Sequence, residues 1–281
     1  MGTVKIACHD SHWRRLYHLN FSHYDQAEET SMPAAIVLDL NRISQSHLEV
    51  EPYQWAPVSG LFSAADAAAL AATFPADRFK RVADHTGEKK HEYQVRSLIR
   101  MSARSISGEK QLSPVWQALA RDLMSPAYRS AMSGLIGIDL SAAEFEANVF
   151  HYPPGGLHGA HTDHRDKIVT HVLYFNESWN DVDGGCLQIL KSSDPQEVVA
   201  KVSPLVGNSA VLVRSDNSWH AVSPVVPSCG LSRRSVTATF YHPGRVSTTV
   251  WPRWNQRLRS LCASRWQRVR SRLSGRSEAR M

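Results

Sequence analysis

His161, Asp163 and His220 are the residues of this sequence whose types best suit a metal centre. A non-haem iron that activates oxygen takes two imidazoles and one carboxylate on one face and keeps its other positions open. The local signature of such a site is His-x-Asp with a distant histidine, and His161 and Asp163 have this spacing. The signature alone is weak, because the same pattern occurs in two other places in the chain.

The surroundings of the two other pairs argue against a catalytic metal there. His23 and Asp25 lie in a polar segment without a strand pattern. His164 and Asp166 are misplaced relative to the strand that precedes them. We therefore interpret both pairs as solvated loop residues.

The pair His161 and Asp163 follows a predicted strand that ends at Tyr152, and it precedes a strand that begins near Lys167. Residues two apart in an extended chain point to the same side, so both side chains can reach one ion. The third ligand should come from a strand far away in sequence, and His220 follows the apolar run SAVLVR and a polar turn. The sequence thus predicts a metal site of two histidines and one aspartate. The alternative is three unrelated polar loop residues.

The composition and the charge limit the class of protein. The chain has 281 residues, of which 42% are hydrophobic and 21% are charged, which excludes wholesale disorder. Its net charge of +6 arises in residues 251–281, which hold nine arginines and one acid, whereas the remainder holds 23 basic and 25 acidic residues. Because the body is nearly neutral, we expect no nucleic-acid partner. For residues 251–281 two interpretations stay open: a solvated helix, or weak contact with an anionic membrane or an acidic partner.

No targeting or spanning segment is visible in the sequence. No apolar run approaches the roughly 20 residues that a bilayer requires, and the first residues lack the apolar region of a secretory signal. The four cysteines lie far apart without a CxxC pair, which argues against a zinc ribbon or a disulfide framework. We therefore expect a cytoplasmic protein with reduced thiols.

The secondary-structure pattern changes near residue 140. Before it, residues 35–43 are predicted as a strand, and helices are predicted after Ser63 and after the Ser-Pro pairs at 113–114 and 125–126. After it, short β-rich runs predict strands: FEANVFHY, KIVTHVLYF, GGCLQIL, SAVLVR and RSVTATFYH. Short strands at this spacing are typical of a sandwich or jelly roll.

Residues 145–242 resemble the catalytic core of iron(II)/2-oxoglutarate-dependent oxygenases, especially the prolyl hydroxylase branch. The features occur in the family's order: Tyr152, the turn at Gly155-Gly156, His161 and Asp163, the TxxxYxN strand of Thr170, Tyr174 and Asn176, Gly184-Gly185, the strand from Pro204 to Val213, His220 and Arg233. Several features in order are much more specific than any one of them.

The resemblance implies a mainly β fold with flanking helices around a double-stranded β-helix (jelly roll) core. The domain limits that we expect are a polar N-terminal arm at 1–35, a helical support and substrate-loop region at 36–139, the oxygenase core at 140–246 and a basic extension at 247–281. The implied cofactors are Fe(II), the cosubstrate 2-oxoglutarate and O2, with ascorbate as a stimulant.

A dianionic cosubstrate needs a cation for its distal carboxylate, and a guanidinium binds a carboxylate through two hydrogen bonds. Arg233 and Arg234 compete for this role. On a strand Arg233 shares its face with Ser235 and Thr237, whose hydroxyls could also bind the carboxylate, whereas Arg234 shares its face with apolar residues. We therefore favour Arg233.

The resemblance implies two tyrosines at the cosubstrate as well. Tyr174 would join Arg233 and Thr237 at the distal carboxylate, and Tyr152 would contact the cosubstrate near the iron. His158 stands where many prolyl hydroxylases have a second tyrosine, which puts the identity of the substrate in doubt.

The predicted reaction is hydroxylation of an unactivated C–H bond, with succinate and CO2 as co-products. Its substrate would be a small molecule or an amino-acid or prolyl group. The resemblance also implies that Asp163 favours hydroxylation, because halogenases of this superfamily have Gly or Ala at the matching position. Two alternatives stay open: a non-catalytic, cupin-like protein that binds a small ligand or a metal, and a membrane-surface scaffold that acts through the Arg-rich tail.

Overall fold

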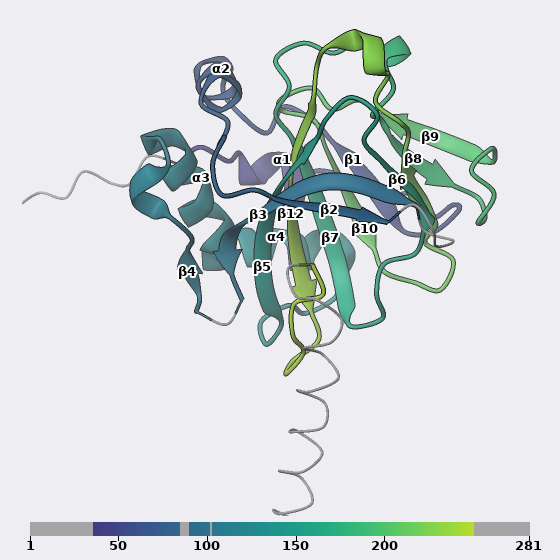
Figure 1. The fold of residues 1–281 in the computed structure, drawn as a ribbon. Coiled ribbons are helices and arrows are strands. Elements are labelled where there is room, and N and C mark those ends of the chain that lie inside the picture. Colours follow the sequence, from purple (N-terminus) through teal and green to yellow (C-terminus); the bar gives the residue numbers. More distant parts are fainter. Residues whose placement is uncertain (1–35, 85–89, 102, 250–281) are drawn as a thin grey trace, which may run out of the picture. The chain divides into compact units, whose positions relative to one another are not determined.

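The computed structural model describes residues 36–84, 90–101 and 103–249, and a curved antiparallel sheet forms its centre (Figure 1). The strands are β1 (Trp55–Val58), β2 (Lys80–Asp84), β3 (His91–Arg100), β4 (Ser105–Ile106), β5 (Glu144–Tyr152), β6 (Leu157–His161), β7 (Lys167–Tyr174), β8 (Leu187–Leu190), β9 (Val198–Val202), β10 (Ser209–Val213), β11 (His220–Val222) and β12 (Arg233–Tyr241). The helices are α1 (Leu40–Ser44), α2 (Ala64–Ala72), α3 (Pro114–Met124) and α4 (Pro126–Ile136).

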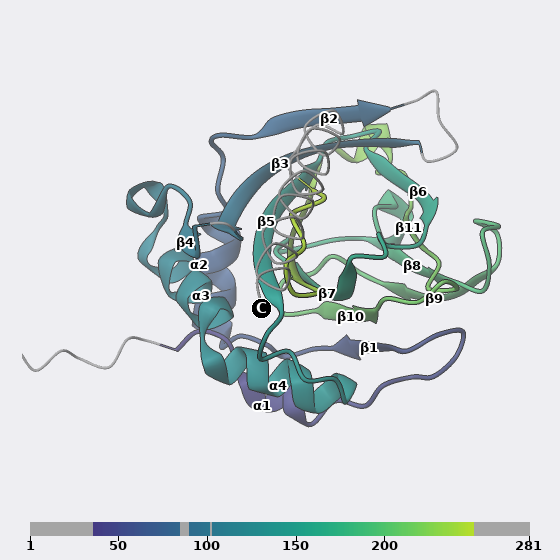
Figure 2. The same cartoon turned by 90° about the horizontal axis from the view of Figure 1, so that it is seen from below.

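The sheet bends round until its two ends face each other. Its strand order is β1-β10-β7-β12-β5-β3-β6-β11-β8-β9, and β2 and β4 pair with β3. Figure 2 shows β8 and β9 returning to the side of β7 and β10. There Leu187 and Ile189 of β8 pack with Val172 and Leu212 of the opposite layer. The predicted jelly-roll core, mainly β with flanking helices, is confirmed.

The helices cover the outer face of the sheet at β5, β12, β7 and β10 (Figure 2). Along β12, Val236, Ala238 and Phe240 belong to the core shared with the helices, so the alternate residues of this strand face the interior of the roll. Trp116 of α3 is fully buried in this core, and its indole N–H donates to the Leu70 carbonyl at 3.1 Å. The outer core therefore supports the strands that carry the interior polar side chains.

The three predicted helix starts are confirmed, each with a physical cause. Ser63 caps α2 by accepting a hydrogen bond from the Asp66 N–H at 3.1 Å, and its hydroxyl donates to the Asp66 carboxylate at 2.6 Å. α3 and α4 each begin with a proline, whose missing N–H costs nothing in the first turn. α4 ends at Gly137, which adopts a φ of 68° that glycine tolerates without strain.

The predicted strand at 35–43 is wrong, because this segment ends in helix α1. Val37 and Leu38 are buried as the apolar pattern suggested, but their N–H groups donate to the Asp122 carboxylate at 2.7 and 2.9 Å instead of to a neighbouring strand. Asp39 then caps the helix.

The strands that the sequence patterns did not predict include β1, β6, β9 and β11. β6 and β11 have the sequences LHGAH and HAV, so they are too short and too polar for an alternating apolar pattern. Pairing with neighbouring strands stabilises them instead.

The predicted arm at 1–35 and all of the predicted extension except 247–249 lie outside the described residues, so the domain limits stay a prediction. Among the residues that the structure describes, no helix combines the length and the apolar character required to span a bilayer.

Candidate metal centre and its cavity

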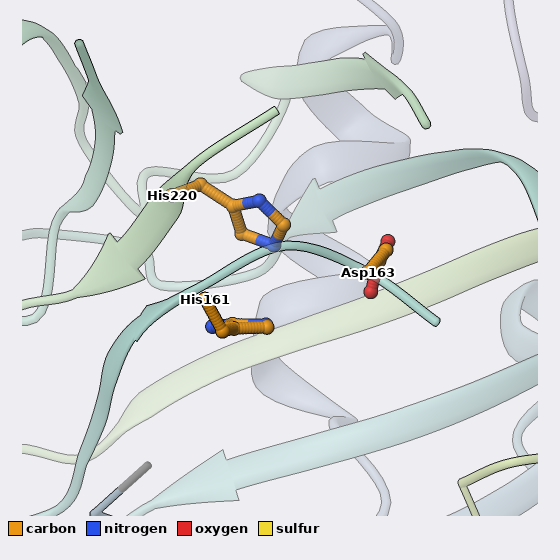
Figure 3. A group of neighbouring side chains, drawn as sticks. All are labelled: His161, Asp163 and His220. Atoms are coloured by element: carbon orange, nitrogen blue, oxygen red, sulfur yellow. The ribbon is translucent and has the colours of Figure 1, made fainter. Parts of the chain in front are cut away.

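Two neighbouring strands bring the predicted ligands together. His161 is the last residue of β6, His220 is the first residue of β11, and the antiparallel pairing of the strands places them opposite each other. Asp163 lies two residues beyond His161. One ligand atom from each side chain lies within 4.8 Å of the other two, and Figure 3 shows the three side chains around a common space. Two imidazoles and one carboxylate at this spacing fit the donor set of a non-haem Fe(II) site.

Backbone carbonyls fix the protonation of both imidazoles. His161 Nδ1 lies 2.8 Å from the Gly159 carbonyl oxygen, and His220 Nδ1 lies 3.0 Å from that of Ser218. Because a carbonyl oxygen can only accept, each Nδ1 carries the proton, and Nε2 of the neutral ring keeps its lone pair. Burial, together with the nearby His220, lowers the pKa of His161 to about 3. Both rings are therefore prepared as neutral metal ligands.

The Asp163 carboxylate is held at both oxygens. Lys167 Nζ donates to Oδ1 at 2.7 Å, and the Thr170 hydroxyl donates to Oδ2 at 2.8 Å. Burial acts to raise the pKa of Asp163, but the charge of Lys167 and its hydrogen bond outweigh it and keep the pKa well below its usual range. Burial likewise acts to lower the pKa of Lys167, and the Asp163 charge raises it above its ordinary value. Asp163 is thus anionic and Lys167 cationic.

The three side chains line one cavity of about 510 Å³ inside the roll. One wall consists of the aromatic rings of Tyr93, Phe150, Tyr152 and His158, which contact one another. Aliphatic side chains line the cavity as well: Val172, Leu187 and Leu212 belong to one packed cluster, whereas Val222 packs with Phe150 and Tyr152. The cavity therefore combines apolar side chains with polar groups at the metal ligands and at Arg233.

Arg233 lies in this cavity as a buried cation. Its side chain is fully buried, and its guanidinium carbon lies 4.7 Å from the centre of the Tyr152 ring and 5.1 Å from that of Tyr174. Its Nη1 donates to the Ser235 hydroxyl at 3.0 Å, whereas its Nε has no hydrogen-bond partner within the described part of the chain. No carboxylate of the described residues forms an ion pair with it. Such a group favours a bound anion, because an uncompensated buried charge is costly.

The other residues predicted at the cosubstrate lie around Arg233. Tyr152, Ser235 and Thr237 line the cavity with it. Tyr174 is fully buried beside it, and burial raises the pKa of its phenol to about 12 although the Arg233 charge opposes the shift. Its hydroxyl has no hydrogen-bond partner of normal geometry among the described residues. These orphaned atoms fit a carboxylate placed between the two side chains.

Arg234 points to the opposite face of β12, as the strand alternation predicted. Its guanidinium donates to the Ala71 carbonyl at 3.3 Å and lies over the Phe74 ring, in the layer of helices. His171 also faces away from the cavity and is buried against Tyr128 and Ser209. Both residues have roles in packing.

The remaining candidates lie at the rim or outside the described residues. His164 is half-exposed and lies 3.5 Å from the Asp166 carboxylate, which agrees with the interpretation of a loop pair. His23 and Asp25 are outside the described residues. His158, at the position where the family often has tyrosine, lines the cavity and stacks on His161 with ring centres 3.9 Å apart.

Sequence reasoning missed three residues of the site. Lys167 was read only as the start of a strand, and Thr170 only as part of the TxxxYxN pattern, yet both hold Asp163. The spacing of four and seven residues from Asp163 carries no signal, because a turn separates them. Tyr93 comes from a segment where we expected substrate contacts, but no pattern distinguished it.

Comparison with known proteins shows which family part of the chain resembles. A family model, described as the 2OG-Fe(II) oxygenase superfamily, matches residues 147–242. No protein of curated function matches the chain in sequence. A prolyl-4-hydroxylase from Pseudomonas putida is 23% identical, with a TM-score of 0.49 over 73% of this chain and 97% of that chain.

A prolyl hydroxylase from Trichoplax adhaerens, solved in complex with a peptide fragment of a hypoxia-inducible factor, is 14% identical. Its TM-score is 0.50, over 72% of this chain and 88% of that chain, which shows a shared fold. The resemblance found in the sequence is confirmed: residues 147–242 match the family model of the 2OG-Fe(II) oxygenase superfamily, whose members use Fe(II), 2-oxoglutarate and O2, and His161, Asp163 and His220 provide a candidate metal site.

Proposed function

We propose that this chain is an Fe(II)- and 2-oxoglutarate-dependent dioxygenase that hydroxylates an unactivated C–H bond of a small molecule or of an amino-acid or prolyl group. The observation that carries the proposal is one cavity that contains both the group of His161, Asp163 and His220 and the buried guanidinium of Arg233, which forms no ion pair with any described residue. A protein that binds only a metal has no need of the second feature.

Each residue of the cavity has a role in this proposal. His161, Asp163 and His220 would hold the iron, while Arg233, Tyr174, Ser235 and Thr237 would bind the distal carboxylate of 2-oxoglutarate. Tyr152, whose ring lies against Arg233, would contact the cosubstrate near the iron. When bound, iron and cosubstrate supply an oxidant made from O2 that can attack a C–H bond, and succinate and CO2 are released. Val172, Leu187 and Leu212 would provide an apolar surface beside the reacting group.

The cavity supports a substrate with a compact reacting part. A volume of about 510 Å³ must hold the cosubstrate and the reacting group together. The Trichoplax enzyme was solved with a peptide bound, so a prolyl or peptidyl substrate is one candidate. The aromatic wall, including His158, suits a flat or ring-shaped group, which a prolyl residue or a cyclic small molecule provides.

The test is turnover and binding by the purified, iron-loaded chain. We expect 2-oxoglutarate to bind only with metal present, and succinate to form in air at a rate that Asp163→Ala lowers by roughly 100-fold or more. Asp166→Ala, in the neighbouring His-x-Asp pair, is the matched control and should retain both properties. Metal binding without 2-oxoglutarate binding or succinate would favour the cupin-like alternative and contradict the proposal.

A further inference from the structure

The metal-ligand carboxylate is paired with a cation inside the cavity. Lys167 Nζ lies 2.7 Å from Asp163 Oδ1, and the two side chains are only 13% and 11% exposed. Lys167 is the first residue of β7 and pairs with Tyr241 of β12 beside a register shift, so a strand holds it. Arg214 also approaches, but it donates to the backbone carbonyl of Asp163 and is paired with Asp216.

We propose that Lys167 is a positioning residue whose positive charge raises the reduction potential of iron held by Asp163 and so keeps the iron ferrous. The inference rests on the proposed function, since it requires iron at His161, Asp163 and His220. It assigns to Lys167 a role that the ligand set alone does not provide.

Electrostatics supports this role for a cation at the ligand oxygen. A fixed positive charge repels a trivalent ion more than a divalent one, and the effect is strong where solvent is largely excluded. The hydrogen bond to Oδ1 also withdraws electron density from the Asp163 carboxylate. The carboxylate then stabilises Fe(III) over Fe(II) less strongly. Thr170 makes a hydrogen bond of similar length to Oδ2 but carries no charge. The two neighbours therefore separate the effect of charge from that of hydrogen bonding.

The charge of Lys167 should matter most when no prime substrate is bound. Iron held by His161, Asp163 and His220 would then be exposed to loss of one electron to O2, which would give Fe(III) and superoxide. Ascorbate would return that electron and restore Fe(II). A higher potential makes the first step less favourable, so Lys167 should lower the dependence on ascorbate.

The experiment compares three variants of the iron-loaded chain by redox titration. Lys167→Gln keeps a donor for Oδ1 without the charge, Lys167→Arg keeps the charge, and Thr170→Val removes only the neutral hydrogen bond. We expect Lys167→Gln to shift the Fe(III)/Fe(II) equilibrium at least tenfold toward Fe(III), which is about 59 mV for one electron. Lys167→Arg should stay near the wild-type potential, and Thr170→Val should shift it less than Lys167→Gln.

Three further measurements keep the outcomes separate. Circular dichroism and Mn(II) affinity establish that each variant folds and retains the site, and air oxidation of the ferrous form should be fastest in Lys167→Gln. An unchanged potential in Lys167→Gln, or an equal shift in Thr170→Val, would overturn the inference while leaving the proposed function intact. Wild-type protein that binds no Fe(II) would instead overturn the proposed function.

Discussion

Two consecutive arginines on β12 have opposite environments, which gives a test at the level of single residues. Arg233 is buried in the cavity beside Tyr152 and Tyr174, whereas Arg234 contacts Phe74 among the helices. We expect Arg233→Ala to raise the Kd of 2-oxoglutarate about 10- to 100-fold, because charge-assisted hydrogen bonds to one carboxylate are lost. Arg234→Ala should leave that Kd within about twofold. Calorimetry with Mn(II) in place of iron measures both.

Arg233→Lys is an informative third variant of this pair. Arg233→Lys keeps the charge but loses the two-point geometry, so its Kd should fall between those of the wild type and Arg233→Ala. Equal losses in Arg233→Ala and Arg234→Ala would show that the faces of β12 are assigned wrongly.

The residues of the site differ in how visible they are in sequence. His161 and Asp163 could be found because a spacing of two places side chains on one side of an extended chain, and Arg233 because strand alternation separates it from Arg234. The contact of Lys167 with Asp163 depends on the path of the intervening turn, and that of Tyr93 depends on which strand β3 pairs with. Neither is encoded by local spacing.

At the scale of elements, His171 joins three of them. It lies on β7, its Nδ1 is 3.0 Å from the Tyr128 hydroxyl of α4, and its Nε2 is 2.9 Å from the Ser209 hydroxyl of β10. Burial lowers its pKa to about 3, from an ordinary value of 6.5. Between these values the unfolded chain binds a proton that the folded chain does not. The free energy of unfolding should therefore fall as the pH drops below about 6.5, by up to about 1.4 kcal/mol per pH unit for this group.

Urea unfolding of metal-free protein between pH 6.5 and 4.5 measures this dependence. His161 contributes in the same direction, so the informative quantity is the difference between wild type and His171→Gln, which retains hydrogen-bonding groups but does not titrate. In the His171→Gln variant, the free energy of unfolding should change less steeply with pH, by an amount that corresponds to about one proton. An identical slope in both proteins would show that His171 titrates normally in the folded state.

The elements themselves were predictable where a local cause forms them. The helices that begin at 64, 114 and 126 each start with a serine cap or a proline, which the sequence shows directly. Long strands such as β5, β7 and β12 have strong apolar runs. Segment 35–43 was misread because Asp122, more than 80 residues away, takes the N–H groups of Val37 and Leu38. The short strands β6 and β11 likewise depend on their partners. Tertiary contacts therefore decide the parts that carry the ligands.

At the scale of the whole molecule, the candidate site lies between two layers that are built differently. β12 and β7 supply Arg233, Tyr174 and Thr170 from strands that the helices support, whereas His161 and His220 come from short strands at the other layer. The metal would therefore connect the two layers, and its binding should stabilise the fold as well as prepare the chemistry.

The net positive charge of the chain comes from residues that follow the described part of the sequence, which gives a final prediction. Residues 251–281 hold nine arginines and one acid, and they lie beyond the last described residue, Thr249. The site is built within residues 93–249, so a chain that ends at Thr249 should form succinate at the full-length rate. If the tail binds anionic surfaces, the same truncation should abolish binding to phosphatidylserine vesicles, and salt should weaken binding of the full-length chain. A folded, truncated chain that loses turnover would place the tail in the working enzyme and contradict the prediction.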